Sequence, residues 1–310
     1  MEKYGRLQVN GNYILGEKGD TVQLRGMSFF WSQWMGQFYN ESCVKWLKDD
    51  WKCTVLRPAM GVEMGGYIDN PYYEKEKAFA VIDAAIKHGL YVIMDYHSHE
   101  AHLKPELAVK FFGEVARRYG NYPNLIYELF NEPLQEHSWK DDIKPYCELV
   151  IAEIRKYDPD NLIVCGTRQW SQLVDEAASE PIKDTNVAYT IHFYSGTHKK
   201  WLRDECEKAL SKGVALFCTE FGTCHASGNG SYSPEETKIW FDFLDKHKIS
   251  WCNWSIADKL ETASALQPGA DGKGGWKMSF LTDSGKLVRN ELIKKNSPIL
   301  DSLKTETKPK

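Results

Sequence analysis

Long apolar runs are absent from this chain of 310 residues. The longest apolar stretch, residues 78–86, is interrupted by Asp83 and falls short of the about 20 residues that a membrane-spanning helix needs. An excess of one charge is also absent, since 39 basic and 43 acidic side chains leave a net charge of -4. So weak a field does not attract nucleic acid or an anionic membrane by electrostatics alone. We therefore expect a soluble protein with neither kind of partner.

Cysteine pairs with the CxxC spacing of redox and zinc motifs are absent too, although the chain has 8 cysteines. Cys165, Cys218 and Cys252 lie inside apolar, strand-like runs. Thiols in such positions pack as small apolar side chains. We expect most of the cysteines to be buried and free.

Aromatic residues, by contrast, are abundant, with 11 Trp, 16 Tyr and 13 Phe. Flat amphipathic rings stack on sugar rings or on nucleobases. Because the chain has no basic excess, this composition favours sugars over nucleic acids as ligands.

Short apolar runs alternate with amphipathic segments along most of the chain. This alternation is typical of repeated βα units around a parallel sheet. Eight such runs, rich in Val, Ile, Leu and Cys, predict eight strands buried on both faces, and eight strands close a barrel. The runs cover residues 22–27, 53–58, 91–96, 125–130, 162–166, 187–193, 214–219 and 250–255.

The sequence therefore predicts a single (β/α)8 TIM barrel over residues 1–295. Apolar residues recur every three to four positions in segments 75–87, 107–119, 143–157 and 234–246, which predicts outer helices. The first 20 residues contain an Asn-Gly turn at Asn10, typical of a hairpin, which we expect to plug one end of the barrel. Residues 296–310 are expected to form a polar, frayed tail.

Polar side chains close nearly every predicted strand. In a barrel of this kind the carboxyl ends of the strands carry the active site, so these side chains are expected to face one crater. They are Arg57, His97, Asn131, Glu132, His192, Tyr194, Glu220 and Trp254.

Two of these residues, Glu132 and Glu220, are carboxylates at equivalent strand ends. Glycoside hydrolysis needs such a pair: one carboxyl protonates the leaving oxygen and the other attacks the sugar or activates water. The pair favours this chemistry over that of a metal or a cofactor, and we expect neither.

At this point the chain resembles glycoside hydrolase family 5. The motifs IYELFNEP (126–133) and TEFG (219–222) are similar to its acid/base and nucleophile signatures, and LRP (56–58), DYH (95–97), IHFY (191–194) and WCNWS (251–255) follow in the family's order. GMS (26–28) with QW (33–34) resembles its cellulase subfamily. The resemblance implies an endo-β-1,4-glucanase that acts with retention of configuration on cellulose and related β-glucans.

Carried over by motif, the resemblance implies that Glu132 is the general acid/base and Glu220 the nucleophile. The charge of Glu220 should then raise the pKa of Glu132 and keep it protonated. Arg57 and Tyr194 are expected to hold Glu220 ionised, and Asn131 to bind the 2-hydroxyl of the sugar.

The same resemblance places further residues around the cleaved sugar and beyond it. His97 and His192 would line the same subsite, His192 near Glu132, and Trp254 would lie beneath the sugar. Trp34, Tyr67 and Trp170 would stack on neighbouring glucosyl units, and Lys259 and Glu261 would bind sugar hydroxyls. Phe30 departs from many bacterial members, which carry His there, and this puts the hydrogen bonding on the glycone side in doubt.

Three alternatives remain open at this stage. The chain could be a β-mannanase or a broad-specificity β-glycanase of the same family, or a glycan-binding protein without turnover. Alternatively, His97 and His99 could begin a metal site, since an HxH pair at a strand end does so in some hydrolases.

No signal peptide follows Met1. A polysaccharide cannot enter a cell intact, so we nevertheless expect a secreted monomer whose signal sequence lies outside these residues. Of the remaining histidines, His99 and His102 are expected in loops near the cleft, whereas His137 and His198 are expected at the surface.

Overall fold

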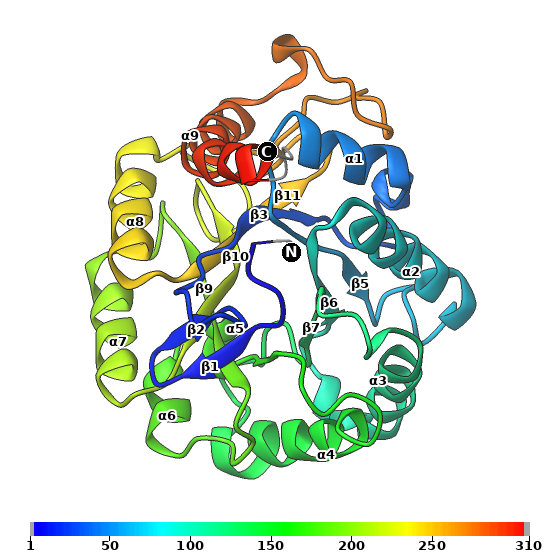
Figure 1. The fold of residues 1–310 in the computed structure, drawn as a ribbon, viewed down its shortest axis with the longest axis vertical. Coiled ribbons are helices and arrows are strands. Elements are labelled where there is room, and N and C mark those ends of the chain that lie inside the picture. Colours follow the sequence, from blue (N-terminus) through cyan, green and yellow to red (C-terminus); the bar gives the residue numbers. More distant parts are fainter. Residues whose placement is uncertain (1–2, 307–310) are drawn as a thin grey trace.

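All eight predicted apolar runs form parallel strands in a computed structural model of the chain, which describes residues 3–306 (Figure 1). Strands β3 to β11 lie side by side, and the pairing of β4 with β6 closes them into a barrel. β5 continues β4 beyond Pro58, which has no N–H to donate to the ladder. The strands are β3 Arg25–Phe29, β4 Val55–Arg57, β5 Ala59–Gly61, β6 Tyr91–His97, β7 Leu125–Glu128, β8 Ile163–Cys165, β9 Val187–Tyr194, β10 Leu216–Gly222 and β11 Ser250–Ile256.

Helices surround the barrel and bury its outer face (Figure 1). Four of them have proline in the first turn, where its missing N–H leaves no helical bond unmade. The α-helices are α1 Glu41–Asp49, α2 Pro71–His88, α3 Pro105–Tyr119, α4 Lys144–Ile154, α5 Arg168–Ser171, α6 Val174–Ser179, α7 Lys200–Ser211, α8 Pro234–His247 and α9 Asp283–Glu306. Shorter helical turns are η1 Gly36–Phe38, η2 Ala101–Leu103, η3 Trp139–Ile143 and η4 Met278–Phe280.

The predicted hairpin is confirmed, and it covers the end of the barrel where the strands begin. β1 (Gln8–Asn10) pairs antiparallel with β2 (Tyr13–Leu15) and lies across the barrel in Figure 1. Gly11, in the turn, has a φ of 58°, which glycine adopts without strain. Leu7 and Ile14 pack on an apolar layer inside the barrel. That layer is Val55, Tyr91, Ile93, Ile126, Leu162, Val164, Ala188, Ala215, Phe217 and Cys252, with Val22 and Leu24.

The predicted frayed tail from residue 296 is wrong over most of its length. α9 continues from Asp283 to Glu306 and lies against β3. Asn296 is fully buried, and its amide nitrogen donates hydrogen bonds to the carbonyls of Arg25 and Lys52. The Asn296 side chain thus ties the helix to backbone carbonyls of the barrel. The polar residues around Asn296 in the sequence give no sign of this contact. Residues 307–310 lie outside the described part.

All eight cysteines are free and buried, as predicted. Burial raises the pKa of the Cys43 and Cys252 thiols, so both stay protonated. Within residues 3–306, no helix combines the length and the apolar character needed to cross a bilayer.

Candidate active site

The polar strand-end residues meet at the end of the barrel opposite the hairpin. Arg57 on β4, His97 on β6, His192 and Tyr194 on β9, and Glu220 on β10 all point into the same space, because the strands are parallel and their carboxyl ends share one rim. Asn131 and Glu132 follow β7 directly. The predicted crater therefore exists, and its walls are side chains from five strands or their ends.

An irregularity in β10 turns Glu220 into this crater. Between Phe217 and Glu220 the strand advances three residues while its neighbour β9 advances two, from Thr190 to His192. Such a bulge adds one residue and resets which side chains face inward. Consequently Phe217 and Glu220 both lie inside the barrel, and so does Thr219 between them, whose hydroxyl bonds Glu128.

Both carboxylate oxygens of Glu220 are held. Arg57 Nη1 donates to Oε2 at 2.9 Å, and the Tyr194 hydroxyl donates to Oε1 at 2.7 Å. A cation and a hydrogen-bond donor both stabilise the ionised carboxylate and fix its orientation. This is the arrangement predicted for Arg57 and Tyr194.

Arg57 is the centre of the site's ion network and is completely buried. Besides Glu220, its guanidinium contacts Glu128 at 2.7 Å, Asp95 at 3.0 Å and the Asn131 side-chain oxygen at 2.6 Å. Arginine suits this role because it offers five donors in a fixed plane. The Asn131 oxygen is thereby occupied, which leaves its amide nitrogen to donate elsewhere.

Glu132 lies beside His192, with its Oε1 2.9 Å from Nδ1 of the imidazole. Burial alone would raise the pKa of Glu132, but the hydrogen bond and charge of His192 outweigh burial and lower it. For His192 burial opposes the charge, whereas the hydrogen bond with Glu132 and the nearby carboxylate of Glu128, 3.8 Å away, raise its pKa to about 9. The prediction that Glu220 raises the pKa of Glu132 is therefore wrong for the free site: the proton of the pair resides on His192.

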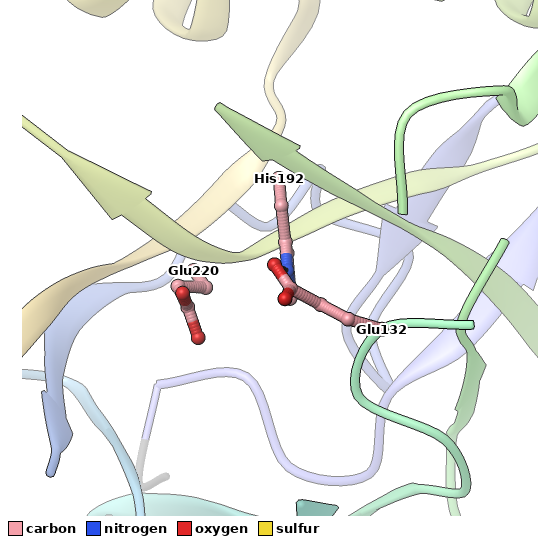
Figure 2. Close-up of side chains that lie close together, drawn as sticks. All are labelled: Glu132, His192 and Glu220. Atoms are coloured by element: carbon pink, nitrogen blue, oxygen red, sulfur yellow. Dashed lines mark hydrogen bonds and ion pairs between the residues drawn. The ribbon is translucent and has the colours of Figure 1, made fainter. Parts of the chain in front are cut away.

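The two candidate catalytic carboxylates face each other across the crater (Figure 2). One oxygen of Glu132, one nitrogen of His192 and one oxygen of Glu220 lie within 4.8 Å of one another. Retaining glycosidases hold their carboxyls about 5 to 5.5 Å apart, whereas inverting enzymes leave about 6.5 to 9.5 Å for a water. The separation thus fits direct attack by one carboxylate.

His97 and Trp254 form one wall of the crater. Their rings are stacked at 5.2 Å with an interplanar angle of 4°, and Trp254 is 5% exposed. Burial and the positive charge of Arg57 lower the pKa of His97 to about 3, so its imidazole is neutral. Its Nδ1 bonds Asp95 at 2.6 Å, which fixes the ring.

Two of the three outer aromatic residues expose their rings, as sugar stacking requires. Trp34 is 49% exposed and Trp170 is 40% exposed. Trp170 also lines a pocket of about 350 Å³ that opens beside Glu132 and includes Gln172, His198 and Ala226. Tyr67 differs: it is 5% exposed and packs against Tyr96 and Phe111 in the core, so its stacking on a sugar stays a prediction.

Lys259 and Glu261 form an ion pair at 2.6 Å on the same side of the cleft as Trp254. The Lys259 ammonium lies 5.1 Å from the ring centre of Phe30, and Phe30 packs against Trp254 and Trp34. The wall of the cleft is therefore apolar at Phe30, and the half-exposed ammonium of Lys259 lies beside it.

Sequence reasoning missed the layer beneath the catalytic pair. Glu128 is fully buried between Arg57 and Thr219, whose hydroxyl donates to it at 2.6 Å. Burial alone would raise the pKa of Glu128, but Arg57 and His192 hold it at about 2. A signal existed, because Glu128 is a charged residue inside an apolar run, at even spacing from Ile126 and hence on the same inward face. His137 and His198 were also placed wrongly, since both are buried.

The HxH pair does not converge on one metal site. His97 Nδ1 faces Asp95, whereas His99 Nδ1 bonds the backbone oxygen of Glu132 at 3.2 Å. Among the described residues, the group dense enough to hold an ion is Glu132, His192 and Glu220. Each of these already has a protein partner with complementary charge or a hydrogen-bond donor.

Comparison with known proteins agrees with this geometry. The family model described as cellulase, glycosyl hydrolase family 5, matches residues 15–260. Endoglucanase A of Evansella cellulosilytica is 46% identical over 88% of this chain, and Endoglucanase Z of Dickeya dadantii is 49% identical over 92% of it. The chain spans 57% and 65% of the lengths of these two relatives.

Solved structures give the same result. A protein from Cytophaga hutchinsonii has a TM-score of 0.97 and 65% identity, with 97% of this chain and 98% of that one covered. The catalytic domain of a Thermobifida fusca endoglucanase has a TM-score of 0.90 and 35% identity, with coverage of 94% and 98%. The (β/α)8 barrel is therefore that of a known group, and this chain belongs to the cellulase family, glycosyl hydrolase family 5.

Proposed function

We propose that this chain is an endo-β-1,4-glucanase that hydrolyses internal bonds of cellulose-like β-glucans by double displacement. The observation that carries the proposal is the close approach of Glu132 and Glu220 in two different environments, one beside an imidazole and one beside a guanidinium. The matched relatives are named endoglucanases, and the Thermobifida fusca catalytic domain has been solved with cellotetraose.

In the first step Glu220 attacks the anomeric carbon of the sugar. A bond forms between that carbon and the Glu220 carboxylate, the glycosidic C–O bond breaks, and a proton passes from Glu132 to the leaving oxygen. Arg57 and Tyr194 hold both oxygens of Glu220 and keep the carboxylate aimed until the bond forms.

Glu132 needs that proton, and His192 is its source. Substrate displaces water around Glu132, which is 14% exposed, and a drier site favours the neutral carboxyl–imidazole pair over two separated charges. The proton then lies on Glu132, facing the leaving oxygen.

In the second step water attacks the anomeric carbon and Glu132 accepts its proton. The bond to Glu220 breaks, which restores the Glu220 carboxylate and the original configuration of the sugar, and the proton taken up by Glu132 returns to His192. Asn131 has its oxygen bound to Arg57, so its amide nitrogen is the group that donates to the 2-hydroxyl. The rings of Trp254, Trp34 and Trp170 contact successive sugars of the chain. The enzyme is a secreted monomer that meets its polymeric substrate outside the cell.

The test is release of reducing ends from carboxymethylcellulose and, in parallel, from mannan. Wild type should act strongly on the glucan, and Glu220→Ala should lower this activity by several orders of magnitude. Glu180→Ala is the matched control. Glu180 directly follows the last residue of α6 and pairs with Lys144, outside the crater, so its loss should leave activity unchanged.

Two further readouts assign the roles. Proton NMR of the first product should show a β-anomer, since double displacement retains configuration. Azide should restore turnover to Glu220→Ala and give the α-glycosyl azide, because it attacks from the side of the missing carboxylate. Preference for mannan would identify a β-mannanase, and a wild type that binds glucan without cleaving it would establish the glycan-binding alternative.

A further inference from the structure

The loop that carries Glu132 has no regular secondary structure, so neighbouring groups hold its backbone. The Glu132 N–H donates to the Ser98 carbonyl at 3.2 Å on one side. On the other side, the segment after β8 supplies two hydrogen bonds. The Trp170 N–H donates to the Pro133 carbonyl at 2.8 Å, and the Ser171 hydroxyl donates to the Asn131 carbonyl at 2.7 Å. The two residues that flank Glu132, Asn131 and Pro133, therefore both accept hydrogen bonds from the segment after β8.

That segment includes α5 (Arg168–Ser171), whose backbone departs from that of a right-handed helix. Gln169, Trp170 and Ser171 have φ values of 58°, 54° and 56°, in the left-handed region that residues other than glycine avoid. Within residues 3–306, no other non-glycine residues with positive φ follow one another in the chain. Left-handed backbone of this kind persists only where surrounding contacts impose it, and it gathers at functional sites.

The contacts that impose it come from the acid/base loop itself. A Cβ on Gly166 would lie 1.9 Å from the Phe130 carbonyl, so the two loops are packed backbone to backbone. Ser171 is fully buried, and its hydroxyl also accepts the Thr167 N–H at 3.3 Å. Meanwhile the Trp170 indole is exposed and lines the same pocket as Glu132.

We infer that Ser171 is a positioning residue for Glu132, and that the left-handed turn 169–171 mechanically joins the sugar-binding Trp170 to the general acid/base. A sugar that seats on Trp170 thereby fixes the backbone on both sides of Glu132. This inference rests on the proposed function, because it assigns a support to the proton donor of that reaction.

The test separates proton donation from general damage by varying the leaving group. Phenyl β-cellobioside and 2,4-dinitrophenyl β-cellobioside place similar rings on the leaving side. The phenyl leaving group needs a proton on the glycosidic oxygen as the bond breaks, whereas dinitrophenolate is a stable anion that departs without one. A loss of Glu132 alignment therefore slows formation of the glycosyl-enzyme from the first substrate alone, and kcat/KM reports that step.

Ser171→Ala should lower kcat/KM for the phenyl substrate by roughly 10- to 100-fold and change it by less than about twofold for the dinitrophenyl substrate. Ser171→Gly should do the same, and it folds without strain because glycine accepts a φ of 56°. Glu132→Ala should show the same selectivity with a larger loss.

Ser250→Ala is the matched control. Ser250 is also fully buried, and its hydroxyl accepts the Leu24 N–H at 2.8 Å, near the opposite end of the barrel. This variant should have a lower free energy of unfolding, while its kcat/KM for both substrates should match that of wild type.

Equal losses on both substrates in the Ser171 variants, or no loss on either, would overturn the inference. If Glu132→Ala keeps its selectivity in that case, the proposed function still stands. A wild type inert toward both substrates would overturn the proposed function and this inference together.

Discussion

The two layers inside the barrel contrast sharply although the same strands build them. On three strands an apolar residue is followed, two positions on and therefore on the same inward face, by a charged one. The pairs are Val55 and Arg57, Ile93 and Asp95, and Ile126 and Glu128. Both members of each pair are fully buried. Burial alone thus does not distinguish the apolar layer that stabilises the fold from the layer that holds the candidate active site.

The two layers differ in the interactions that their buried side chains require. The lower layer is closed by the hairpin and needs only apolar contact. In the upper layer each buried charge depends on a partner, because an unpaired charge away from water is strongly unfavourable. We therefore expect lower-layer substitutions to change stability alone, and upper-layer substitutions to change activity and stability together.

The largest expected effect is that of Arg57→Met. Glu128, Asp95 and Glu220 would face one another without their shared cation. Unfolding free energy should fall by about 3 to 5 kcal/mol, and kcat by roughly 100-fold or more, since Glu220 and Asn131 lose their donor. Urea unfolding and turnover of a soluble glucan measure the two effects.

Arg25→Met is the control for that variant. Arg25 is also buried, but it bonds Asp245 at 2.9 Å, between β3 and α8 and outside the crater. It should destabilise the protein and leave kcat unchanged. An equal loss of kcat in both arginine variants would break the distinction between the layers.

Ile126→Ala should have the next largest effect, and on stability alone. It removes a buried side chain from the layer beneath Glu128 and should lower unfolding free energy by about 2 to 5 kcal/mol. At a temperature where the variant is folded, kcat should match wild type. A drop in kcat without a drop in stability would show that the lower layer also takes part in the chemistry.

The smallest expected effect is on pH dependence, and it probes the upper layer. Because folding raises the pKa of His192 from an ordinary value of about 6.5 to about 9, its contribution to stability is complete below pH 6.5 and is lost as pH rises through 9. That contribution is on the order of 3 kcal/mol. Thermal unfolding between pH 6 and pH 10 should show the decline in wild type and little of it in His192→Asn.

In the proposed mechanism the same proton serves catalysis, so the alkaline limb of kcat/KM should lie near pH 9 in wild type. In His192→Asn the limb should move to lower pH, because Glu132 then titrates without its partner. An unchanged limb would exclude His192 as the source of the proton.

Local pattern was enough to predict the barrel and the approach of the candidate catalytic pair. Apolar runs mark the strands directly, and Glu132 and Glu220 stand out because each follows such a run. Residues whose state depends on distant neighbours were not predictable in this way. Tyr67 is a core residue because of Tyr96 and Phe111, and Asn296 is buried because two carbonyls of the barrel accept its amide hydrogens.

The protonation of Glu132 was mispredicted for a related reason. From the sequence, Glu220 is the evident charge near Glu132, but the fold places the His192 imidazole within 2.9 Å of it. The nearer, hydrogen-bonded charge dominates. Sequence placed His192 near this carboxylate without showing which charge would prevail.

The extra residue in β10 lets two neighbours in the chain face the same crater. Without the bulge, Glu220 would stand three positions after the inward-facing Phe217 and would turn toward the helices, away from Arg57 and Tyr194. With it, the Thr219 hydroxyl reaches Glu128 while the next side chain, Glu220, reaches Arg57 and Tyr194. One strand thus supplies adjacent residues to two levels of the crater, which a regularly alternating strand cannot do.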